Sequence, residues 1–201
     1  MPYRFYRYDL LLWRHYLLQS PFTVSKDYLM KQGAEDPFQY GETPLTELER
    51  IARAAEVGRN DVVYDLGCGT GRTSFFLNAV FGCKVQGIEI IPHFFERADA
   101  IKERAGNEDV SFVCTDMLET DFEAATVVYF YGTCSEDDFV KALIERMKLS
   151  LQPGTRVITI SYPLSEFGGS SFVMQEEIPT RFNWGTSTAF LQVYQPERNQ
   201  D

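Results

Sequence analysis

The sequence predicts an α/β protein: a seven-stranded, mostly parallel sheet with a C-terminal antiparallel strand, helices on both faces and an N-terminal helical extension. Three observations support this fold class. From residue 60 onward, short apolar runs alternate with segments of helical periodicity, as in a parallel sheet covered on both faces. Near the C-terminus, two strand-like runs follow each other with no helix between them. Residues 1–38 are rich in aromatics and are expected to form one or two helices.

The alternating part of the chain supplies the predicted parallel sheet and its helices. The expected strands are Val62–Leu66, Lys84–Ile90, Val110–Thr115, Thr126–Tyr131 and Arg156–Tyr162. The expected helices are Gly71–Phe81, Pro92–Ala105 and Glu136–Leu151. In such a sheet, ligands bind beyond the carboxyl ends of the strands, where the strand order reverses.

The last part of the chain breaks the alternation. The runs at 171–178 and 187–195 read as two strands joined by a loop of about eight residues. We expect them to pair as an antiparallel hairpin at one edge of the sheet.

Length and composition limit the organisation and the partners. A chain of 201 residues fits one domain, so we expect residues 1–38 to extend the main domain at 39–201, as a lid over the substrate or as an interface. A net charge of −10 argues against nucleic acid or an anionic membrane as the main partner. Four cysteines without a CxxC pair argue against a metal site or a disulfide framework, and favour a cytoplasmic protein.

A glycine-rich turn after the first strand predicts a nucleotide-type site. VVYDLGCGTG places Gly67, Gly69 and Gly71 where the backbone can approach a ligand closely. Glu89, 18 residues beyond Gly71, ends the next strand and can accept hydrogen bonds from the ribose hydroxyls of an adenosine. Asp65 lies before the glycines, where it would repel a pyrophosphate and favour a cationic ligand. The pattern therefore favours S-adenosylmethionine over a nicotinamide cofactor.

Two further segments are assigned to the same pocket. Ile90 follows Glu89 directly, and FVCTDML ends the third strand with Asp116 and Met117. Asp116 could accept a hydrogen bond from the adenine amino group while Met117 packs on the ring. The alternative is that Asp116 caps the following turn.

The stretch QYGETPLTEL (39–48) begins a helix. Thr43 is a fair N-cap, and Pro44 suits the first helical position. Glu42 could serve only as a partner of the helix dipole, or it could meet the ammonium group of the cofactor.

DLGCGTG and GIEI resemble the class I, Rossmann-like S-adenosylmethionine-dependent methyltransferases over residues 40 to about 195. YGETP resembles the cofactor loop of Dot1-type lysine methyltransferases, which implies that Tyr40, Glu42 and Thr43 close over the methionine part of the cofactor. VVYFYGTCSEDDF and PGTRVITISYPL are similar to small prokaryotic and mitochondrial protein-lysine methyltransferases. FNWGTSTAFLQVY fits both groups, with Trp184 near the substrate and a final edge strand. The paired-Asn motif and basic nucleosome-binding segment of Dot1-type enzymes are missing.

The resemblance implies an enzyme that transfers a methyl group in line to a deprotonated amine, most simply a protein lysine. Four aromatic side chains near the strand ends could line the acceptor channel: Tyr129, Tyr131, Tyr162 and Trp184. We assign the catalytic site to Tyr131 and Trp184, whereas Tyr129 fits the core better. A small-molecule N- or O-methyltransferase and a non-catalytic S-adenosylmethionine-binding module are the alternatives. The methyl acceptor, the number of methyl groups and the oligomeric state remain open at this stage.

Overall fold

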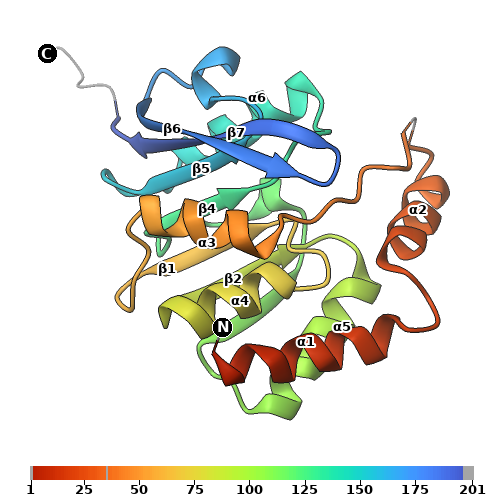
Figure 1. Cartoon of the computed structure of the whole chain (residues 1–201). Coiled ribbons are helices and arrows are strands. Elements are labelled where there is room, and N and C mark those ends of the chain that lie inside the picture. The colour runs from red at the N-terminus through yellow and green to blue at the C-terminus, as the bar shows by residue number, and fades with distance from the viewer. Residues whose placement is uncertain (1, 35, 197–201) are drawn as a thin grey trace, which may run out of the picture.

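A single seven-stranded sheet, in the order β3-β2-β1-β4-β5-β7-β6, organises the chain (Figure 1). The computed structural model describes residues 2–34 and 36–196. The strands are β1 (Val62–Leu66), β2 (Lys84–Glu89), β3 (Val110–Cys114), β4 (Val127–Phe130), β5 (Arg156–Ile160), β6 (Phe172–Phe182) and β7 (Gly185–Tyr194). Strands β1 to β5 pair in parallel, and β7 runs antiparallel to both β5 and β6. The predicted fold class is confirmed.

Helices cover both faces of this sheet. They are α1 (Tyr3–Tyr16), α2 (Pro21–Lys31), α3 (Leu45–Ala54), α4 (Arg72–Phe81), α5 (Pro92–Ala105) and α6 (Asp137–Lys148), with short 3₁₀ turns at Met117–Glu119 and Leu164–Phe167. One apolar core joins α1, α3, α4 and α5 to the first face. A second core joins α6 and the turn at Leu164–Phe167 to the other face. The carboxyl ends of the parallel strands lie between these two layers.

The C-terminal hairpin is tighter than the sequence suggested. Strand β6 continues to Phe182 and β7 begins at Gly185, so Asn183 and Trp184 alone separate them, and the prediction of an eight-residue loop was wrong. Strand β6 continues through Pro179, because β6 is the edge strand, where a residue without an N–H group is tolerated. The prediction of a final edge strand was also wrong, because β7 lies between β5 and β6.

The N-terminal segment forms two helices that differ in their contacts. Phe5, Tyr8 and Leu12 of α1 are buried in the first core, and the Tyr8 ring stacks on Phe75 at 4.5 Å. Helix α2 lies farther from the sheet and contributes Val24 to a small cluster with α5 (Figure 1). The domain boundary at residue 38 and the lid role remain predictions. In residues 2–34 and 36–196, no helix is long and apolar enough to cross a membrane.

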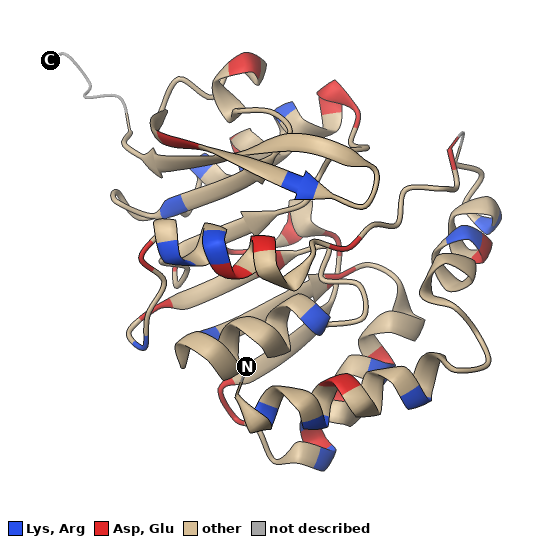
Figure 2. Cartoon of the chain, viewed as in Figure 1, with Lys and Arg blue, Asp and Glu red and all other residues tan. Residues whose placement is uncertain are grey.

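Charged residues are spread over the elements in the view of Figure 2, with both signs on the same helices, such as α3. Two ion pairs on α3 illustrate this mixing: Arg50 with Glu47, and Arg53 with Glu49. Exposed pairs of this kind contribute little to stability, so the excess of acidic residues bears mainly on solubility and on the choice of partner.

Candidate functional site

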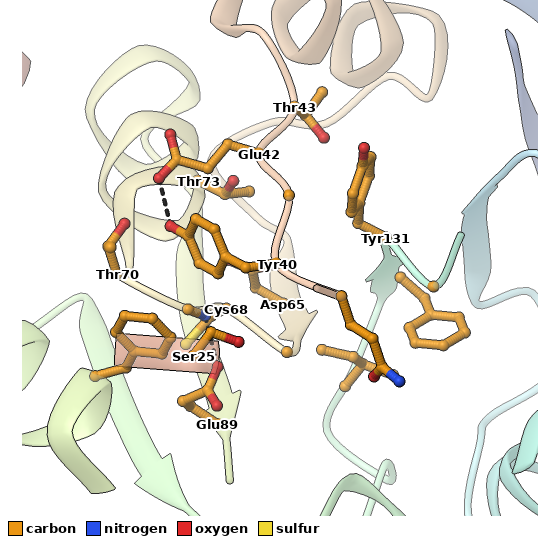
Figure 3. Close-up of a pocket in the computed structure, with 18 of the residues that line it drawn as sticks. Ser25, Tyr40, Glu42, Thr43, Asp65, Cys68, Thr70, Thr73, Glu89 and Tyr131 are labelled. Carbon is orange, nitrogen blue, oxygen red and sulfur yellow. Dashed lines mark hydrogen bonds between the residues drawn. The ribbon is translucent and has the colours of Figure 1, made fainter. Parts of the chain in front are cut away.

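A cavity lies at the carboxyl ends of β1, β2 and β4, beneath the segment that precedes α3. Its walls include the glycine-rich turn after β1, the residues that follow β2 and β4, and part of α2. Figure 3 shows Tyr40, Asp65 and Glu89 around this hollow, with Tyr131 on its other side. The predicted site residues in its lining are Tyr40, Glu42, Thr43, Asp65, Gly67, Gly69, Glu89, Ile90, Met117 and Tyr131. Gly71, Asp116 and Trp184 lie outside it.

The glycines after β1 serve two structural purposes. Gly69 has φ +54°, and a Cβ placed there would come within 3.1 Å of the Tyr40 ring. Gly71 has φ +78°, and its Cβ would lie 2.8 Å from Phe112, so this glycine lets α4 approach the sheet closely. Gly71 therefore shapes the turn from behind the cavity.

Glu89 braces the glycine-rich turn from the end of β2. One carboxylate oxygen accepts a hydrogen bond from the Gly69 N–H at 2.7 Å, and the other accepts from the Ile91 N–H at 2.8 Å. Burial raises the pKa of this carboxyl, and the backbone donors oppose that rise. Each oxygen keeps a lone pair for a further donor, as binding to two ribose hydroxyls would require.

Asp65 is a buried carboxyl at the end of β1. It accepts a hydrogen bond from the Ser74 hydroxyl at 2.6 Å. Burial raises its pKa to about 7; the Ser74 bond lowers the pKa and the Glu89 charge raises it further. A cationic ligand in the cavity would favour its ionised form. Burial also raises the pKa of the neighbouring Cys68 thiol, which makes that residue a poor nucleophile.

The YGE segment closes the cavity from above. The Tyr40 hydroxyl donates to Glu42 (Figure 3), and the Tyr40 ring packs against Phe22 and Phe94 at 5.0 and 5.4 Å. Burial first, and then the Glu42 charge, raise the Tyr40 pKa well above its ordinary value, so the hydroxyl stays protonated. The aromatic packing fixes Glu42 at the rim of the cavity.

The predicted N-cap before α3 was wrong. The helix begins at Leu45 after Pro44, with no side-chain cap. The hydroxyl of Thr43 is instead hydrogen-bonded to that of Tyr129, a buried residue on β4. Because Tyr129 would otherwise leave its hydroxyl buried without a partner, this bond outweighs capping and ties the YGE segment to the sheet.

The third strand contributes less than expected. Asp116 accepts a hydrogen bond from the Leu118 N–H at 2.9 Å, which is the turn-capping geometry. Met117 and Ile90 both lie in the cavity lining, and Ile90 is 48 % exposed. The adenine contact of Asp116 remains a prediction.

A second hollow adjoins the first. Gln39, Tyr40, Gly41, Tyr131 and Cys134 line both, and the remaining walls come from Phe38, Thr133, Ser161 and Trp184. The indole N–H of Trp184 donates to the Tyr131 hydroxyl at 2.8 Å. The Trp184 ring also stacks on Phe182 at 5.1 Å. The structure thus brings together Tyr131 and Trp184, which are 53 residues apart in the sequence.

A buried polar network supports the turn that carries Tyr131. The Tyr162 hydroxyl donates to the Gly132 carbonyl at 2.8 Å, and Thr159 donates to the Tyr162 carbonyl at 2.6 Å. Gln192 in turn donates to Thr159 at 3.2 Å. Ser161, between these residues, has φ +78°, a strained conformation for a residue with a Cβ. Sequence reasoning placed Tyr162 in the acceptor channel, whereas its hydroxyl holds the neighbouring turn.

Tyr162→Phe should lower the free energy of unfolding by about 1 kcal/mol, because one half-buried hydrogen bond is lost. The ring contact with Phe167, at 5.0 Å, is retained. Urea denaturation measures the change, and Tyr3→Phe on the exposed end of α1 is the matched control. A loss of unfolding free energy no larger than in the control would show that the hydrogen bond from Tyr162 to the Gly132 carbonyl does not stabilise the fold.

Arg72, the first residue of α4, is a further residue of the site that the sequence did not predict. It lies in the cavity lining, its Nε donates to Asp9 of α1 at 2.7 Å, and it faces Glu42 at 3.8 Å. An arginine after a glycine-rich turn was a usable signal, but the partner on α1 was not visible in local spacing.

The chain matches a known family of methyltransferase domains. The family model of the ANTKMT methyltransferase domain matches residues 65–169. A protein-lysine N-methyltransferase from Saccharolobus islandicus is 30 % identical over 140 residues, covering 69 % of this chain and 85 % of the relative. An H3 lysine-79-specific histone-lysine N-methyltransferase from Dictyostelium discoideum is 28 % identical over 135 residues, covering 60 % of this chain but 7 % of the relative.

Solved structures agree with this assignment. An RNA methyltransferase from Salinibacter ruber in complex with S-adenosylhomocysteine superimposes with a TM-score of 0.66 and 27 % identity, covering 80 % of this chain and 98 % of the other. The cavity has features that such a cofactor requires: close backbone at Gly69, acceptor oxygens on Glu89 and a buried carboxyl at Asp65. The chain belongs to the ANTKMT methyltransferase domain family and is a class I methyltransferase that uses S-adenosylmethionine.

Proposed function

We propose that this enzyme methylates lysine side chains of proteins, by in-line transfer to the deprotonated amine. The observation that carries the proposal is the second hollow, which shares a wall with the cofactor cavity and opens at the surface. Its mouth bears two aromatic side chains that are more than half exposed, Phe38 at 69 % and Trp184 at 56 %. An open aromatic mouth suits a long side chain presented by a large partner better than a small molecule that must be enclosed.

The chemistry asks little of the protein beyond position and environment. The bound cofactor supplies a methyl group on a sulfonium, and the acceptor must be a neutral amine. Apolar aromatic walls disfavour an ammonium ion and so lower the pKa of a lysine that enters. Burial raises the pKa of Tyr131, which keeps its hydroxyl neutral. Trp184 donates to that hydroxyl and so uses one lone pair of its oxygen. Tyr131 can therefore still direct its other lone pair or its proton toward the amine.

Other predicted roles become part of the same proposal. Glu89 binds the ribose, Glu42 the methionine ammonium, and Asp65 favours the sulfonium of the cofactor. The remaining proposed cofactor contacts in the cavity lining are Tyr40, Thr43, Gly67, Gly69, Ile90 and Met117. Gly71 and Asp116, which lie outside that lining, would act through the turns that they shape. Residues 1–38 and 39–201 act as one domain, in which α2 borders the cavity through Ser25.

The relatives support a protein acceptor, since the names of two describe lysine methylation. The RNA methyltransferase from Salinibacter ruber raises nucleic acid as another acceptor for this fold. A net charge of −10 disfavours that acceptor here, because RNA binding depends on clustered Lys and Arg.

The direct test is labelling of a lysate with methyl-labelled S-adenosylmethionine. We expect labelled protein bands and methyl-lysine after hydrolysis. A second lysate, whose lysine amines were first converted to amides by acetylation, should give no label. Label confined to the low-mass fraction, or to RNA, would contradict the proposal.

Trp184→Ala should reduce the rate of protein labelling by at least about tenfold, because an aromatic wall and the donor to Tyr131 are both removed. Trp184→Phe keeps the aromatic face and should lose less. Affinity for S-adenosylhomocysteine should stay unchanged in both, because Trp184 lies outside the cofactor cavity. Equal losses of labelling rate in the two variants would contradict the role of the aromatic face. Weaker binding of S-adenosylhomocysteine would show that Trp184 acts on the cofactor and not on the acceptor.

A further inference from the structure

Arg72 is the single cation among the described side chains that line the cofactor cavity, where the acidic ones are Glu42, Asp65 and Glu89. The cofactor carries one carboxylate, at its amino-acid end, which needs a cation or free N–H groups. Arg72 sits on the first turn of α4, directly after the glycine-rich turn, where the helix dipole also favours an anion. It is therefore the side chain best suited to that carboxylate.

Arg72 lies between two carboxylates that it engages unequally. Its Nε donates to Asp9 at 2.7 Å, whereas its Nη1 lies 3.8 Å from Glu42, beyond hydrogen-bond distance. A guanidinium has five N–H donors, and binding through Nε leaves the forked edge of the two terminal nitrogens free. Glu42 with this edge forms a pair of opposite charges, matching the ammonium and carboxylate of an amino acid.

The hydrogen bond to Asp9 holds the Arg72 guanidinium away from Glu42, so that both charges of this pair are available to the cofactor. Without it, Arg72 could swing to Glu42 and neutralise the carboxylate that the ammonium needs. Asp9 itself is held in place because α1 is anchored by Phe5, Tyr8 and Leu12, which are buried in the first core. The N-terminal helix thus reaches the cofactor cavity through this ion pair, in addition to the packing of Tyr16 against Phe94.

We propose that Asp9 is a positioning residue for the amino-acid end of S-adenosylmethionine, acting through Arg72. The inference rests on the cofactor cavity proposed above and is independent of the methyl acceptor. It gives the N-terminal helix a part in cofactor affinity in addition to its part in the core.

Calorimetric titration of the full chain with two probes tests this inference. S-adenosylhomocysteine carries the amino-acid end, and 5′-methylthioadenosine keeps the adenosine and sulfur but lacks that end. Arg72→Gln should weaken S-adenosylhomocysteine binding by at least about tenfold, the effect of a lost charge-assisted pair. Asp9→Asn should weaken it by roughly three- to tenfold, a smaller loss because Arg72 remains. Both should change the affinity for 5′-methylthioadenosine by less than about twofold.

The double variant separates positioning from a general structural effect. If Asp9 acts through Arg72, Asp9→Asn adds nothing to Arg72→Gln. Asp27→Asn, on the exposed face of α2, is the matched control and should leave both affinities unchanged. Thermal unfolding without ligand checks that each variant folds.

Three outcomes would overturn the proposal: an unchanged affinity in Asp9→Asn, additive losses in the double variant, or equal losses for both probes. Equal losses would point to a general disturbance of the cavity. None of these outcomes bears on lysine methylation, which the labelled lysate tests separately.

Discussion

Glu89→Gln is expected to lower the affinity for S-adenosylmethionine by at least about 100-fold, since two charge-assisted hydrogen bonds of about 1.5 kcal/mol or more are at stake. The carboxylate accepts from the N–H groups of Gly69 and Ile91, and each oxygen keeps a lone pair for a ribose hydroxyl. A glutamine has one acceptor oxygen, so its NH₂ group would face one of these N–H donors. The turn and the ribose would then compete for the remaining oxygen.

The same change should alter stability much less than binding. One backbone N–H loses its partner, which costs roughly 1–3 kcal/mol. Against this, burial already raises the pKa of Glu89, so a neutral amide avoids the desolvation of a charge. The two effects oppose each other, and the variant should fold.

Titration with S-adenosylhomocysteine and urea denaturation measure the two quantities on the same preparation. Glu96→Gln, on the exposed side of α5, removes a charge of the same kind and is the control. An affinity within about threefold of the unaltered chain would show that Glu89 serves the turn alone and not the ribose.

Glu89 and Asp65 show what local sequence can reveal about the site. Glu89 and Asp65 end buried strands beside a glycine-rich turn, and alternation with short connections places both at one edge of the sheet. Strands β1 to β5 were predicted within two residues at each end for the same reason. The resemblance added Tyr40 and Glu42, which the structure places at the cavity.

The missed features depend on partners far away in the sequence. Thr43 reads as a cap until Tyr129, 86 residues away, supplies a buried hydroxyl. Arg72 depends on Asp9, 63 residues earlier, and no periodicity links them. The strands of the hairpin are longer than predicted, since β6 continues through Pro179, which an edge strand tolerates, and strand order is a property of the whole sheet.

Ligand-free protein is expected to lose stability as the pH rises from about 4 to about 7, through Asp65. Burial raises the pKa of this carboxyl from 3.8 to about 7. Below pH 3.8 both the folded and unfolded chains hold the proton, so Asp65 contributes nothing. Between the two values only the unfolded chain releases it, which favours unfolding by up to about 4 kcal/mol. Above pH 7 the effect is constant.

Asp65→Asn isolates this contribution, because the amide oxygen can still accept from Ser74. The variant should match the unaltered chain at pH 4 and exceed its unfolding free energy at pH 8. Denaturation at pH 4, 6 and 8 gives the comparison. Parallel pH profiles for the two proteins would assign the slope to other groups.

Ionisation of Asp65, which lowers the stability of the ligand-free protein, should instead strengthen the binding of the cofactor. The sulfonium of S-adenosylmethionine should favour the ionised form of Asp65. The affinity for S-adenosylmethionine should therefore rise between pH 6 and 8, as Asp65 releases its proton. S-adenosylhomocysteine has no sulfonium charge and should show a shallower rise, and Asp65→Asn should abolish the difference between the two ligands. A difference that survives in this variant would place the carboxylate that senses the sulfonium elsewhere. A buried carboxyl that destabilises the empty protein is then explained by its charge complementarity to the cofactor.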